Sequence, residues 1–475
     1  MSENIYIDRH LEGVLSNAAE TFKVVILGGS RQVGKSTLMK RFLSDKGVHM
    51  VSFDNPSLRQ AAKDDPELFL AQYEPPLMID EFQYVPELLP FIKMAVDARS
   101  GAGLYFLTGS QLFKMMDKVG ESLAGRAAVL SLSSFSQAEI KGMPASAPFL
   151  PSEHVASIAP MSLKEAQEAV FRGGMPALVC AGKKMNRDLF FSSYVQTYIE
   201  RDIRKVINVR DIGRFESFLA CVAARTGEEL VYDDIASTIG VDAKTVKAWI
   251  GVLEATGLVF LLHSWSGNPV KRVVKRPKLH FMDTGLACHL ARIADSSALF
   301  ASSQAGHFFE SWVVGQIVRS YQAAGLDPSH YLYYYRDDAM REIDLLISRS
   351  GRLYPVEIKM SANPGTDAMR HFTVIDEMSV ERAPGCVLSL TQNPVPVRDR
   401  GLVVNVAALW GQGNKTKNVT DVDATADVRR QCHDNQDLLH EVGEKGRQFV
   451  EDHFSVANFK KSVDAFLDGN MTDGL

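Results

Sequence analysis

The sequence predicts a multi-domain α/β protein: a parallel sheet covered by helices, then a helical domain, then a smaller second α/β domain. Three observations carry this prediction. Residues 1 to about 140 alternate short apolar runs with helical patterns, residues 163–259 are helical in pattern, and a second α/β pattern begins near residue 306. The 475 residues correspond to about three domains at roughly 150 residues each. We expect the divisions at 1–143, 144–162 (a linker), 163–285, 286–410 and 411–475 (a linker and a helical tail).

The composition is that of an ordinary globular protein. Hydrophobic residues make up 46% and charged residues 23%, which excludes wholesale disorder. Lys and Arg number 52 against 57 Asp and Glu, so the net charge of −5 excludes a globally basic coat but not a local basic patch. The five cysteines are scattered, without a Cys-x-x-Cys spacing. They argue against a disulfide framework and a cysteine zinc site, and they fit a reducing compartment.

The sequence indicates neither a membrane segment nor a secretion signal. No apolar run approaches the ~20 residues that a transmembrane helix needs. The N-terminal stretch contains acidic residues and lacks the apolar core of a signal peptide. We therefore expect a soluble cytoplasmic protein without a membrane partner.

The first domain contains five short apolar runs, each the length of one strand. Continuous hydrophobicity, with helical patterns between the runs, is typical of parallel strands that are buried on both faces. The runs are residues 24–27, 48–53, 77–79, 104–107 and 129–130.

A glycine-rich stretch follows the first run and precedes an amphipathic helix. It satisfies the G-x-x-x-x-G-K-[ST] pattern of a P-loop, the Walker A motif. The backbone N–H groups of such a loop surround a phosphate, and the helix N-terminus adds its positive end. We expect Lys35 to reach the β- and γ-phosphates of ATP and Ser36 to bind Mg²⁺. The predicted ATP-binding residues are Gly29, Ser30, Arg31, Gln32, Val33, Gly34, Lys35, Ser36 and Thr37.

Two carboxylates end the third apolar run, about 50 residues after the P-loop. Asp80 is expected to hold Mg²⁺. Glu81 is expected to act as the general base that polarises the attacking water. A strand that merely ends in solvated acids is the alternative, but the position downstream of a P-loop favours a Walker B motif.

Three further residues are candidates for catalysis at this site. The fourth run ends in Thr108 and Ser110, where a hydroxyl would lie between the two Walker motifs. We choose Ser110 first and Thr108 second; a helix cap is the alternative role of Ser110. Arg126 is a candidate for stabilising phosphoryl charge, within its own chain or on a neighbouring subunit. A structural ion pair is its alternative.

The helical domain contains a helix–turn–helix pattern at residues 231–254. Asp242 is a plausible N-cap of the second helix, and short strands after Gly257 would complete a winged helix. Lys244 and Lys247 lie on the exposed face of that helix, where they could enter a major groove.

A basic turn follows the helix–turn–helix pattern and places five cations in eight residues. Such a patch could contact phosphates of DNA or RNA. The alternatives are a solvated turn and a protein-contact module, so the partner is left open. The cations are Lys271, Arg272, Lys275, Arg276 and Lys278.

The second α/β domain contains a carboxylate pattern. Asp344, Glu357 and Lys359 have the spacing D-x₁₂-E-x-K, which resembles the core of restriction-endonuclease-like nucleases. On paired strands the two carboxylates would converge and bind Mg²⁺, with Lys359 activating water or stabilising phosphorane charge. Glu310, on a helical pattern, would add a further ligand. Such a fold can also persist as a binding scaffold without cleavage.

These motifs together give residues 1 to about 410 a resemblance to bacterial and archaeal AAA-superfamily ATPases that carry a C-terminal domain of unknown function. The resemblance gives Lys35, Ser36, Asp80 and Glu81 their usual ATPase roles, with Ser36 replacing the commoner Thr. The cellular role of that family is largely unassigned, so the resemblance implies the ATPase and not the process. The matching stretches are residues 26–37, 53–56, 79–83, 107–111, 121–126, 173–176, 198–203, 281–286 and 355–359.

Three functions follow as hypotheses. The first is a Mg²⁺-dependent ATPase that rearranges the winged-helix and nuclease-like domains, and the second is an ATP-gated nuclease. The third is an ATP-bound switch that acts through a protein partner, which an intact Glu81 disfavours. Self-association is plausible for an AAA-type protein. Residues 444–455 resemble the closing helix of many glycosyltransferases, but we infer no glycosyl transfer.

Overall fold

The computed structural model describes residues 6–110, 120, 122–152, 158–197, 211–268, 272, 275–397 and 400–410. Several predictions fall outside the described residues: the helical tail at 411–475, Lys271 of the basic turn, and the resembling stretches at 111, 121 and 198–203.

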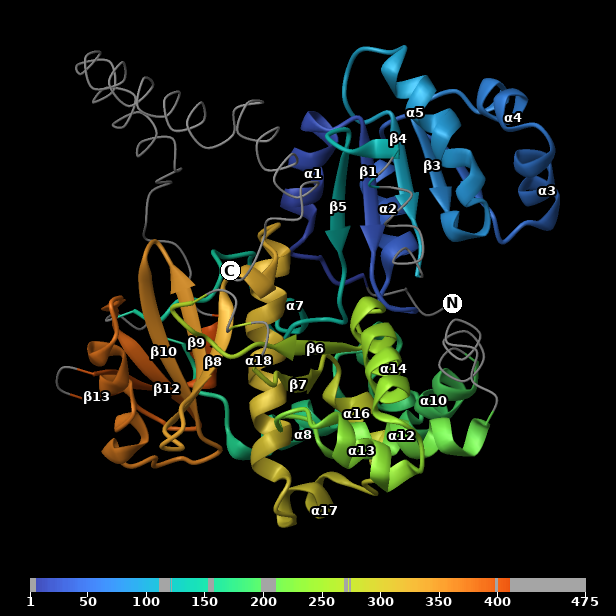
Figure 1. Cartoon of the computed structure of the whole chain (residues 1–475). Coiled ribbons are helices and arrows are strands. Elements are labelled where there is room, and N and C mark those ends of the chain that lie inside the picture. The colour runs from blue at the N-terminus through green and yellow to red at the C-terminus, as the bar shows by residue number, and fades with distance from the viewer. Residues whose placement is uncertain are drawn as a thin grey trace, which may run out of the picture. The chain divides into compact units, whose positions relative to one another are not determined.

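The N-terminal domain is built on a five-stranded sheet in which each strand runs parallel to its neighbours (Figure 1). The order across the sheet is β2–β3–β4–β1–β5. All five predicted strands and their parallel arrangement are confirmed. The bounds are β1 (Val24–Gly28), β2 (His49–Ser52), β3 (Leu77–Asp80), β4 (Tyr105–Thr108) and β5 (Ala127–Ser131).

Both faces of this sheet are buried, because successive side chains of β1 enter different cores. Val24 and Ile26 pack with residues of α3, α4 and α5, whereas Val25 and Leu27 pack with residues of α1 and α2. Burial on both faces explains the continuous hydrophobicity of the strands. The helices are α1 (Glu12–Thr21), α2 (Lys35–Leu43), α3 (Pro56–Asp64), α4 (Pro66–Gln72) and α5 (Leu89–Asp97), with the 3₁₀ turns η1 (Phe82–Tyr84) and η2 (Pro86–Leu88).

The middle of the chain is helical, as predicted. α13 (Tyr232–Ile239) ends at Gly240, whose φ of 70° is the left-handed geometry that glycine allows, and α14 (Ala243–Ala255) follows. Asp242 caps α14 by accepting a hydrogen bond from the Thr245 N–H at 2.8 Å. Strands β6 (Val259–Leu262) and β7 (Lys278–Phe281) then pair antiparallel. The other helices are α7 (Gln137–Ile140), α8 (Leu163–Arg172), α9 (Pro176–Ala181), α10 (Arg187–Tyr194), α12 (Ile212–Ala224), α16 (Thr284–Leu290) and α17 (Ser296–Ala301), with η4 (Gly182–Lys184).

The C-terminal domain combines one long helix with a mixed sheet (Figure 1). Strands β8, β9 and β10 are antiparallel, β10, β12 and β14 are parallel, β13 pairs antiparallel with β14, and β11 pairs with β10. The elements are α18 (Ala305–Ala323), β8 (Leu332–Arg336), β9 (Glu342–Arg349), β10 (Arg352–Ile358), β11 (Glu381–Arg382), β12 (Gly385–Ser389), β13 (Val395–Val397) and β14 (Gly401–Asn405), with η6 (Pro328–His330), η7 (Thr366–Met369), η8 (Phe372–Glu377) and η9 (Val406–Leu409).

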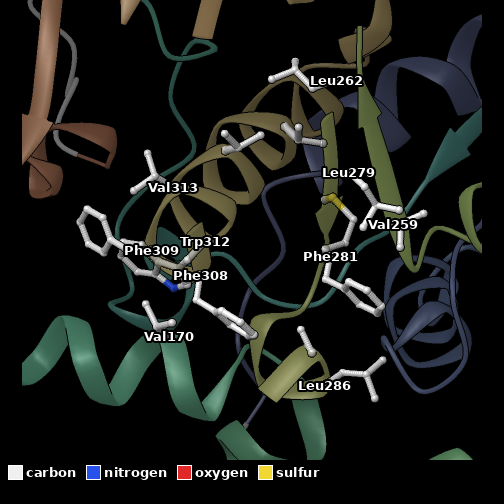
Figure 2. Close-up of a cluster of buried hydrophobic side chains, with 14 of the residues drawn as sticks. Val170, Val259, Leu262, Leu279, Phe281, Leu286, Phe308, Phe309, Trp312 and Val313 are labelled. Carbon is white, nitrogen blue, oxygen red and sulfur yellow. The ribbon is translucent and has the colours of Figure 1, made fainter. Parts of the chain in front are cut away.

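One hydrophobic core runs from the helical region into the C-terminal domain without a break. Figure 2 shows part of it: Phe281 of β7 and Leu286 of α16 lie near Phe308 at the start of α18. The continuation of β6 also joins the edge of the C-terminal sheet, where the Trp265 N–H donates to the Tyr334 carbonyl at 2.6 Å. In the described part of the chain no helix has both the length and the apolar character that a bilayer crossing requires.

Candidate functional site

The P-loop joins β1 to α2, and its glycines are required by geometry. Gly29 has φ 132°, and a Cβ there would lie 2.1 Å from the Leu132 carbonyl oxygen. Gly34 has φ 95° and directly precedes α2. The loop therefore brings the backbone N–H groups at the start of α2 to the carboxyl edge of the sheet, where a phosphate can be bound.

Lys35 is buried and is held by the P-loop itself. Its Nζ donates to the carbonyl oxygens of Gly29 at 3.0 Å and Ser30 at 2.7 Å. Burial lowers the pKa of Lys35 to about 8, although the carboxylates of Glu81 and Asp80 act in the opposite direction. Among the described residues no carboxylate lies in hydrogen-bond contact with this ammonium group, which can therefore turn to a phosphate.

Asp80 lies at the end of β3 between two hydroxyl groups. Ser36 Oγ donates to Asp80 Oδ1 at 2.8 Å, and Thr108 Oγ1 at the end of β4 donates to the same oxygen. The Ser36 hydroxyl at the start of α2 and the Asp80 carboxylate at the end of β3 are oxygen ligands of the kind that bind Mg²⁺ together with phosphate and water. Ser110 is buried, and its hydroxyl has no hydrogen-bond partner among the described residues. Of the two candidate hydroxyl groups, Thr108, predicted second, is therefore the one that contacts the predicted metal ligand Asp80.

Glu81 follows Asp80 in an unusual backbone conformation. Its φ of 53° is left-handed, which is strained for a residue with a Cβ and is often found at functional sites. The side-chain amide of Gln83 donates to Glu81 Oε2. Burial raises the pKa of Glu81, whereas Gln83 and Lys35 lower it. Gln83 is not among the residues predicted from the sequence, and its position two residues after Glu81 was the available signal.

Arg126 is not brought to the nucleotide site of its own chain. It precedes β5, whereas the P-loop leaves the opposite end of the neighbouring strand β1. Its guanidinium pairs with the Asp97 carboxylate, with Nη2–Oδ2 at 3.0 Å. The expected catalytic role within the chain is therefore corrected: parallel pairing puts residue 126 at the amino edge of the sheet, away from the phosphate-binding edge.

Arg9 contacts the P-loop and was missed, because no motif marks it. Its buried guanidinium donates to the Val33 carbonyl at 2.8 Å, to the Ser133 carbonyl at 2.6 Å and to Glu139 Oε1 at 3.0 Å. It also lies over the Phe135 ring, 4.5 Å from the centroid. Arg9 thus fixes a P-loop peptide to the segment that follows β5.

A pocket of about 910 Å³ adjoins the P-loop. It lies between the segment before α1, the start of α2 and the end of α9, and most of its surface is apolar. Its volume and apolar lining are within the range of pockets that bind small molecules and cofactors. Its lining includes Tyr6, Ile7, Val33, Gly34, Thr37, Leu38, Phe135, Pro176 and Ala181.

The structure brings Asp344, Glu357 and Lys359 together in the C-terminal domain. Lys359 Nζ lies 2.6 Å from Glu357 Oε1 and 3.5 Å from Asp344 Oδ2. Asp344 Oδ2 also accepts the Ile358 N–H at 2.8 Å. Burial raises the pKa of Glu357 to about 8, with the Asp344 carboxylate acting in the same direction and Lys359 against it. β9 and β10 pair antiparallel, so the two carboxylates converge as the spacing predicted.

Glu310 meets a lysine from the helical region instead of completing a metal site. Lys278 Nζ of β7 donates to Glu310 Oε1 at 2.9 Å and lies 2.6 Å from Glu342 Oε1. Burial raises the pKa of Glu310 to about 7, and Lys278 opposes that shift. In the described residues no three His, Cys, Asp or Glu side chains are grouped as a metal site. The expectation of Glu310 as a further metal ligand is corrected: its charge is balanced by Lys278.

The basic turn is partly engaged within the chain. Lys278 is buried, so it does not belong to an exposed phosphate-binding patch, which corrects the expectation from the sequence. Arg272 lies over the rings of Trp265 and Tyr333, and Lys275 Nζ donates to the Arg336 carbonyl at 3.0 Å. Exposed cations remain on the turn and on α14: Lys275, Arg276, Lys244 and Lys247.

Comparison with known protein families divides the chain into three matched segments. An AAA domain matches residues 21–141, a domain of unknown function (DUF8612) matches 163–297, and a second domain of unknown function (DUF4143) matches 305–409. The AAA match contains the P-loop, Asp80 and Glu81, and the last match contains Asp344, Glu357 and Lys359. The resemblance to AAA-superfamily proteins with a C-terminal domain of unknown function is confirmed.

Two mycobacterial proteins are similar to this chain over much of its length. The uncharacterized proteins Mb2031c of Mycobacterium bovis and Rv2008c of Mycobacterium tuberculosis are each 27% identical over 363 residues, which cover 76% of this chain and 76% of theirs. Among solved structures, the Walker-type ATPase PABY2304 of Pyrococcus abyssi is 15% identical with a TM-score of 0.36, over 62% of this chain and 97% of that one. The RuvB Holliday junction branch migration motor of Thermotoga maritima gives 19% and 0.26, over 54% and 89%. TM-scores this low carry no conclusion about function.

Proposed function

We propose that this chain, an AAA-superfamily P-loop protein with a C-terminal domain of unknown function, binds ATP with Mg²⁺ and hydrolyses it. The observation that carries the proposal is the convergence of Ser36 and Thr108 on Asp80, beside a P-loop lysine whose hydrogen bonds to described residues go to the carbonyl oxygens of the P-loop. This arrangement offers positive charge and N–H groups to phosphate and oxygen ligands to a divalent cation.

Each residue of the site has a defined task in this proposal. Lys35 and the N–H groups at the start of α2 neutralise the phosphates, and Ser36 and Asp80 hold Mg²⁺, which shields phosphate charge when bound. Glu81 takes a proton from the attacking water, and Gln83 orients the Glu81 carboxylate. The raised pKa of Glu81 strengthens it as a base relative to an ordinary carboxylate. Arg126 has no task in the site of its own chain.

The pocket beside the P-loop accommodates the nucleoside in this proposal. Tyr6 and Ile7 lie before α1, and Pro176 begins α9, so the base would contact both the AAA domain and the helical region. Nucleotide binding could therefore shift the helical region relative to the AAA domain in this proposal.

We further propose that hydrolysis is coupled to nucleic acid through exposed cations of the helical region. Lys244 and Lys247 on α14, and Arg276 on the basic turn, are exposed and positioned for phosphate contact. The alternative is a protein partner on the same surface.

One experiment separates these outcomes. ATP hydrolysis by the purified protein is measured with and without double-stranded and single-stranded DNA, and the DNA is then run on a gel. We expect Mg²⁺-dependent hydrolysis that DNA stimulates. Hydrolysis that is indifferent to DNA would redirect the search to a protein partner, and absence of hydrolysis in Mg²⁺ would contradict the ATPase itself. Repeating the assay over a range of protein concentrations tests self-association.

A second candidate function is metal-dependent cleavage of nucleic acid by the C-terminal domain. The convergence of Asp344, Glu357 and Lys359 favours it, and the absence of a three-ligand group among the described residues weighs against it. If the domain cleaves DNA or RNA with Mg²⁺, Lys359→Ala should lower cleavage at least 100-fold and leave ATP binding unchanged. Cleavage that persists in this variant comes from a contaminant and removes the candidate.

A further inference from the structure

A buried ion pair joins the helical region to the C-terminal domain. Lys278 of β7 and Glu310 of α18 are 2.9 Å apart, with side chains only 5% and 11% exposed. Lys278 also contacts Glu342 at 2.6 Å, two residues from Asp344 on β9. The pair therefore lies where two elements outside the C-terminal sheet meet its acidic cluster, Asp344 and Glu357.

The first connection from this pair to the P-loop runs through α18. Arg319 on α18 donates to the Ser134 carbonyl at 3.0 Å, and Gln316 Oε1 accepts the Gln137 N–H at 2.8 Å. Arg9 holds the same segment, residues 133–139, to the Val33 carbonyl of the P-loop. Glu310 lies nine residues before Arg319 on the same helix, a distance of about 13.5 Å along the axis at 1.5 Å per residue.

The second connection runs through β6 and β7. Gly257, between α14 and β6, lies beside the P-loop: a Cβ there would be 4.0 Å from the Ser30 backbone nitrogen. β6 pairs with β7 over four residues, and Lys278 begins β7. Figure 2 shows Leu279 of β7 in the core that α18 also enters. The glycine beside the P-loop thus lies two residues before the small sheet in which Lys278 begins the second strand.

We propose that the Lys278–Glu310 ion pair couples nucleotide occupancy of the P-loop to the acidic cluster of the C-terminal domain. This inference rests on the proposed nucleotide binding. Two separate connections from the P-loop end on the two partners of this pair, so a shift of either the helical region or α18 changes the pair's geometry. Close-packed interiors do not deform gradually, so such a pair takes discrete arrangements. Displacement of Lys278 would leave Glu342 and its neighbour Asp344 with less positive charge.

The test uses the reciprocity of coupling: if nucleotide alters the pair, altering the pair changes nucleotide affinity. The probe is the fluorescent nucleotide N-methylanthraniloyl-ADP with Mg²⁺, titrated onto the full-length chain. We expect Lys278→Met and Glu310→Gln to change its Kd by about 5- to 150-fold, the usual range of such coupling. Lys278→Arg, which keeps the charge, should recover most of the wild-type value. Arg382→Met is the matched control, because it breaks an ion pair with Asp376 in the same domain away from β7 and α18.

The double variant Lys278→Met/Glu310→Gln guards against failure to fold, since it removes both charges together. Thermal melts followed by circular dichroism establish which variants are folded. A folded single or double variant with a wild-type Kd overturns the inference, as does an equal change in the Arg382→Met control. If wild-type protein does not bind the probe, the proposed nucleotide binding fails instead, so the two failures are distinguishable.

Discussion

The nucleotide site and the acidic cluster of the C-terminal domain use the same side chains in opposite ways. Both place carboxylates at strand ends beside a lysine. At the P-loop, Lys35 is held by two carbonyl oxygens and Asp80 by hydroxyl groups. In the acidic cluster, Lys359 contacts both Glu357 and Asp344. Beside the cluster, Lys278 contacts Glu310 and Glu342.

Residue types alone therefore do not make a ligand site. Neutral hydrogen-bond partners can be exchanged for phosphate and Mg²⁺ without leaving a buried charge unpaired. Lys359 is already paired with two buried carboxylates and has no such freedom, because moving it away would leave their negative charge buried and unpaired. The P-loop is therefore arranged for a ligand, whereas the acidic cluster balances itself within the chain.

The largest expected effect is loss of nucleotide binding in Lys35→Ala. The variant removes the cation that faces the phosphates, and charge-assisted contacts of this kind are worth about 3 kcal/mol, or roughly 100-fold or more in Kd. Isothermal titration with ATP and Mg²⁺ measures it. Lys40→Ala, an exposed lysine on the same helix, is the control. Wild-type affinity for ATP in Lys35→Ala would contradict the claim that the P-loop site is arranged to bind a phosphate.

Glu81→Gln should separate binding from turnover. The amide keeps the shape of the side chain but cannot take a proton, so turnover should fall about 10²- to 10⁴-fold while Kd for ATP changes little. Phosphate release and nucleotide titration on the same sample provide both numbers. Glu87→Gln, an exposed acid nearby, serves as the reference. Wild-type turnover in Glu81→Gln would remove Glu81 as the base.

Thr108→Val should lower the affinity of the site for Mg²⁺ more than Ser110→Ala does. Thr108 donates to Asp80, and loss of a partner of a metal ligand typically costs about 10- to 100-fold in metal affinity. Ser110 has no such contact among the described residues, so its variant should stay within about threefold. The Mg²⁺ concentration for half-maximal hydrolysis is the readout. The reverse ranking would restore Ser110 as the functional hydroxyl.

The smallest expected effect is a pH dependence of the free energy of unfolding that comes from His280, two residues after Lys278 on β7. Burial lowers the pKa of His280 to about 3, with Lys278 acting in the same direction, and its Nδ1 lies 3.0 Å from Ser311 Oγ. The unfolded chain therefore binds more protons than the folded one between about pH 6.5 and 3.

Stability should accordingly fall as the pH drops through this window, by at most about 1.4 kcal/mol per pH unit from this group. Urea unfolding at pH 7, 6 and 5 measures the slope. His280→Asn should flatten it, whereas His330→Asn, at an exposed position, should not. An unchanged slope in His280→Asn would show that other groups set the acid stability.

Much of the nucleotide site was predictable because its signals are local. Lys35 and Ser36 sit at fixed positions of a motif, and Asp80 and Glu81 end an apolar strand. Parallel strands bring their carboxyl ends to one edge, so the strand pattern already implied that these residues converge. The role of Gln83 and the preference for Thr108 were not predictable, because both depend on side-chain direction.

The C-terminal cluster was only partly predictable. The spacing of Asp344, Glu357 and Lys359 implied their convergence on paired strands. The pairing of Glu310 with Lys278 involves a helix and a strand from different parts of the chain, for which no spacing rule exists. The role of Arg126 within its own chain was wrong for a related reason: the sequence shows that Arg126 precedes a strand, but only the strand pairing shows at which edge of the sheet it lies. The alternative of a structural ion pair fits its contact with Asp97, and a role on a neighbouring subunit stays a prediction.

The parallel sheet, the P-loop and the helix–turn–helix follow from local sequence, because hydrophobic period, glycine positions and capping residues act over a few neighbouring residues. Which charged side chains form ion pairs within the chain depends on the tertiary structure. Arg9, Lys278 and Glu310 took their partners across long sequence separations, since a buried charge must find an opposite charge wherever packing places one.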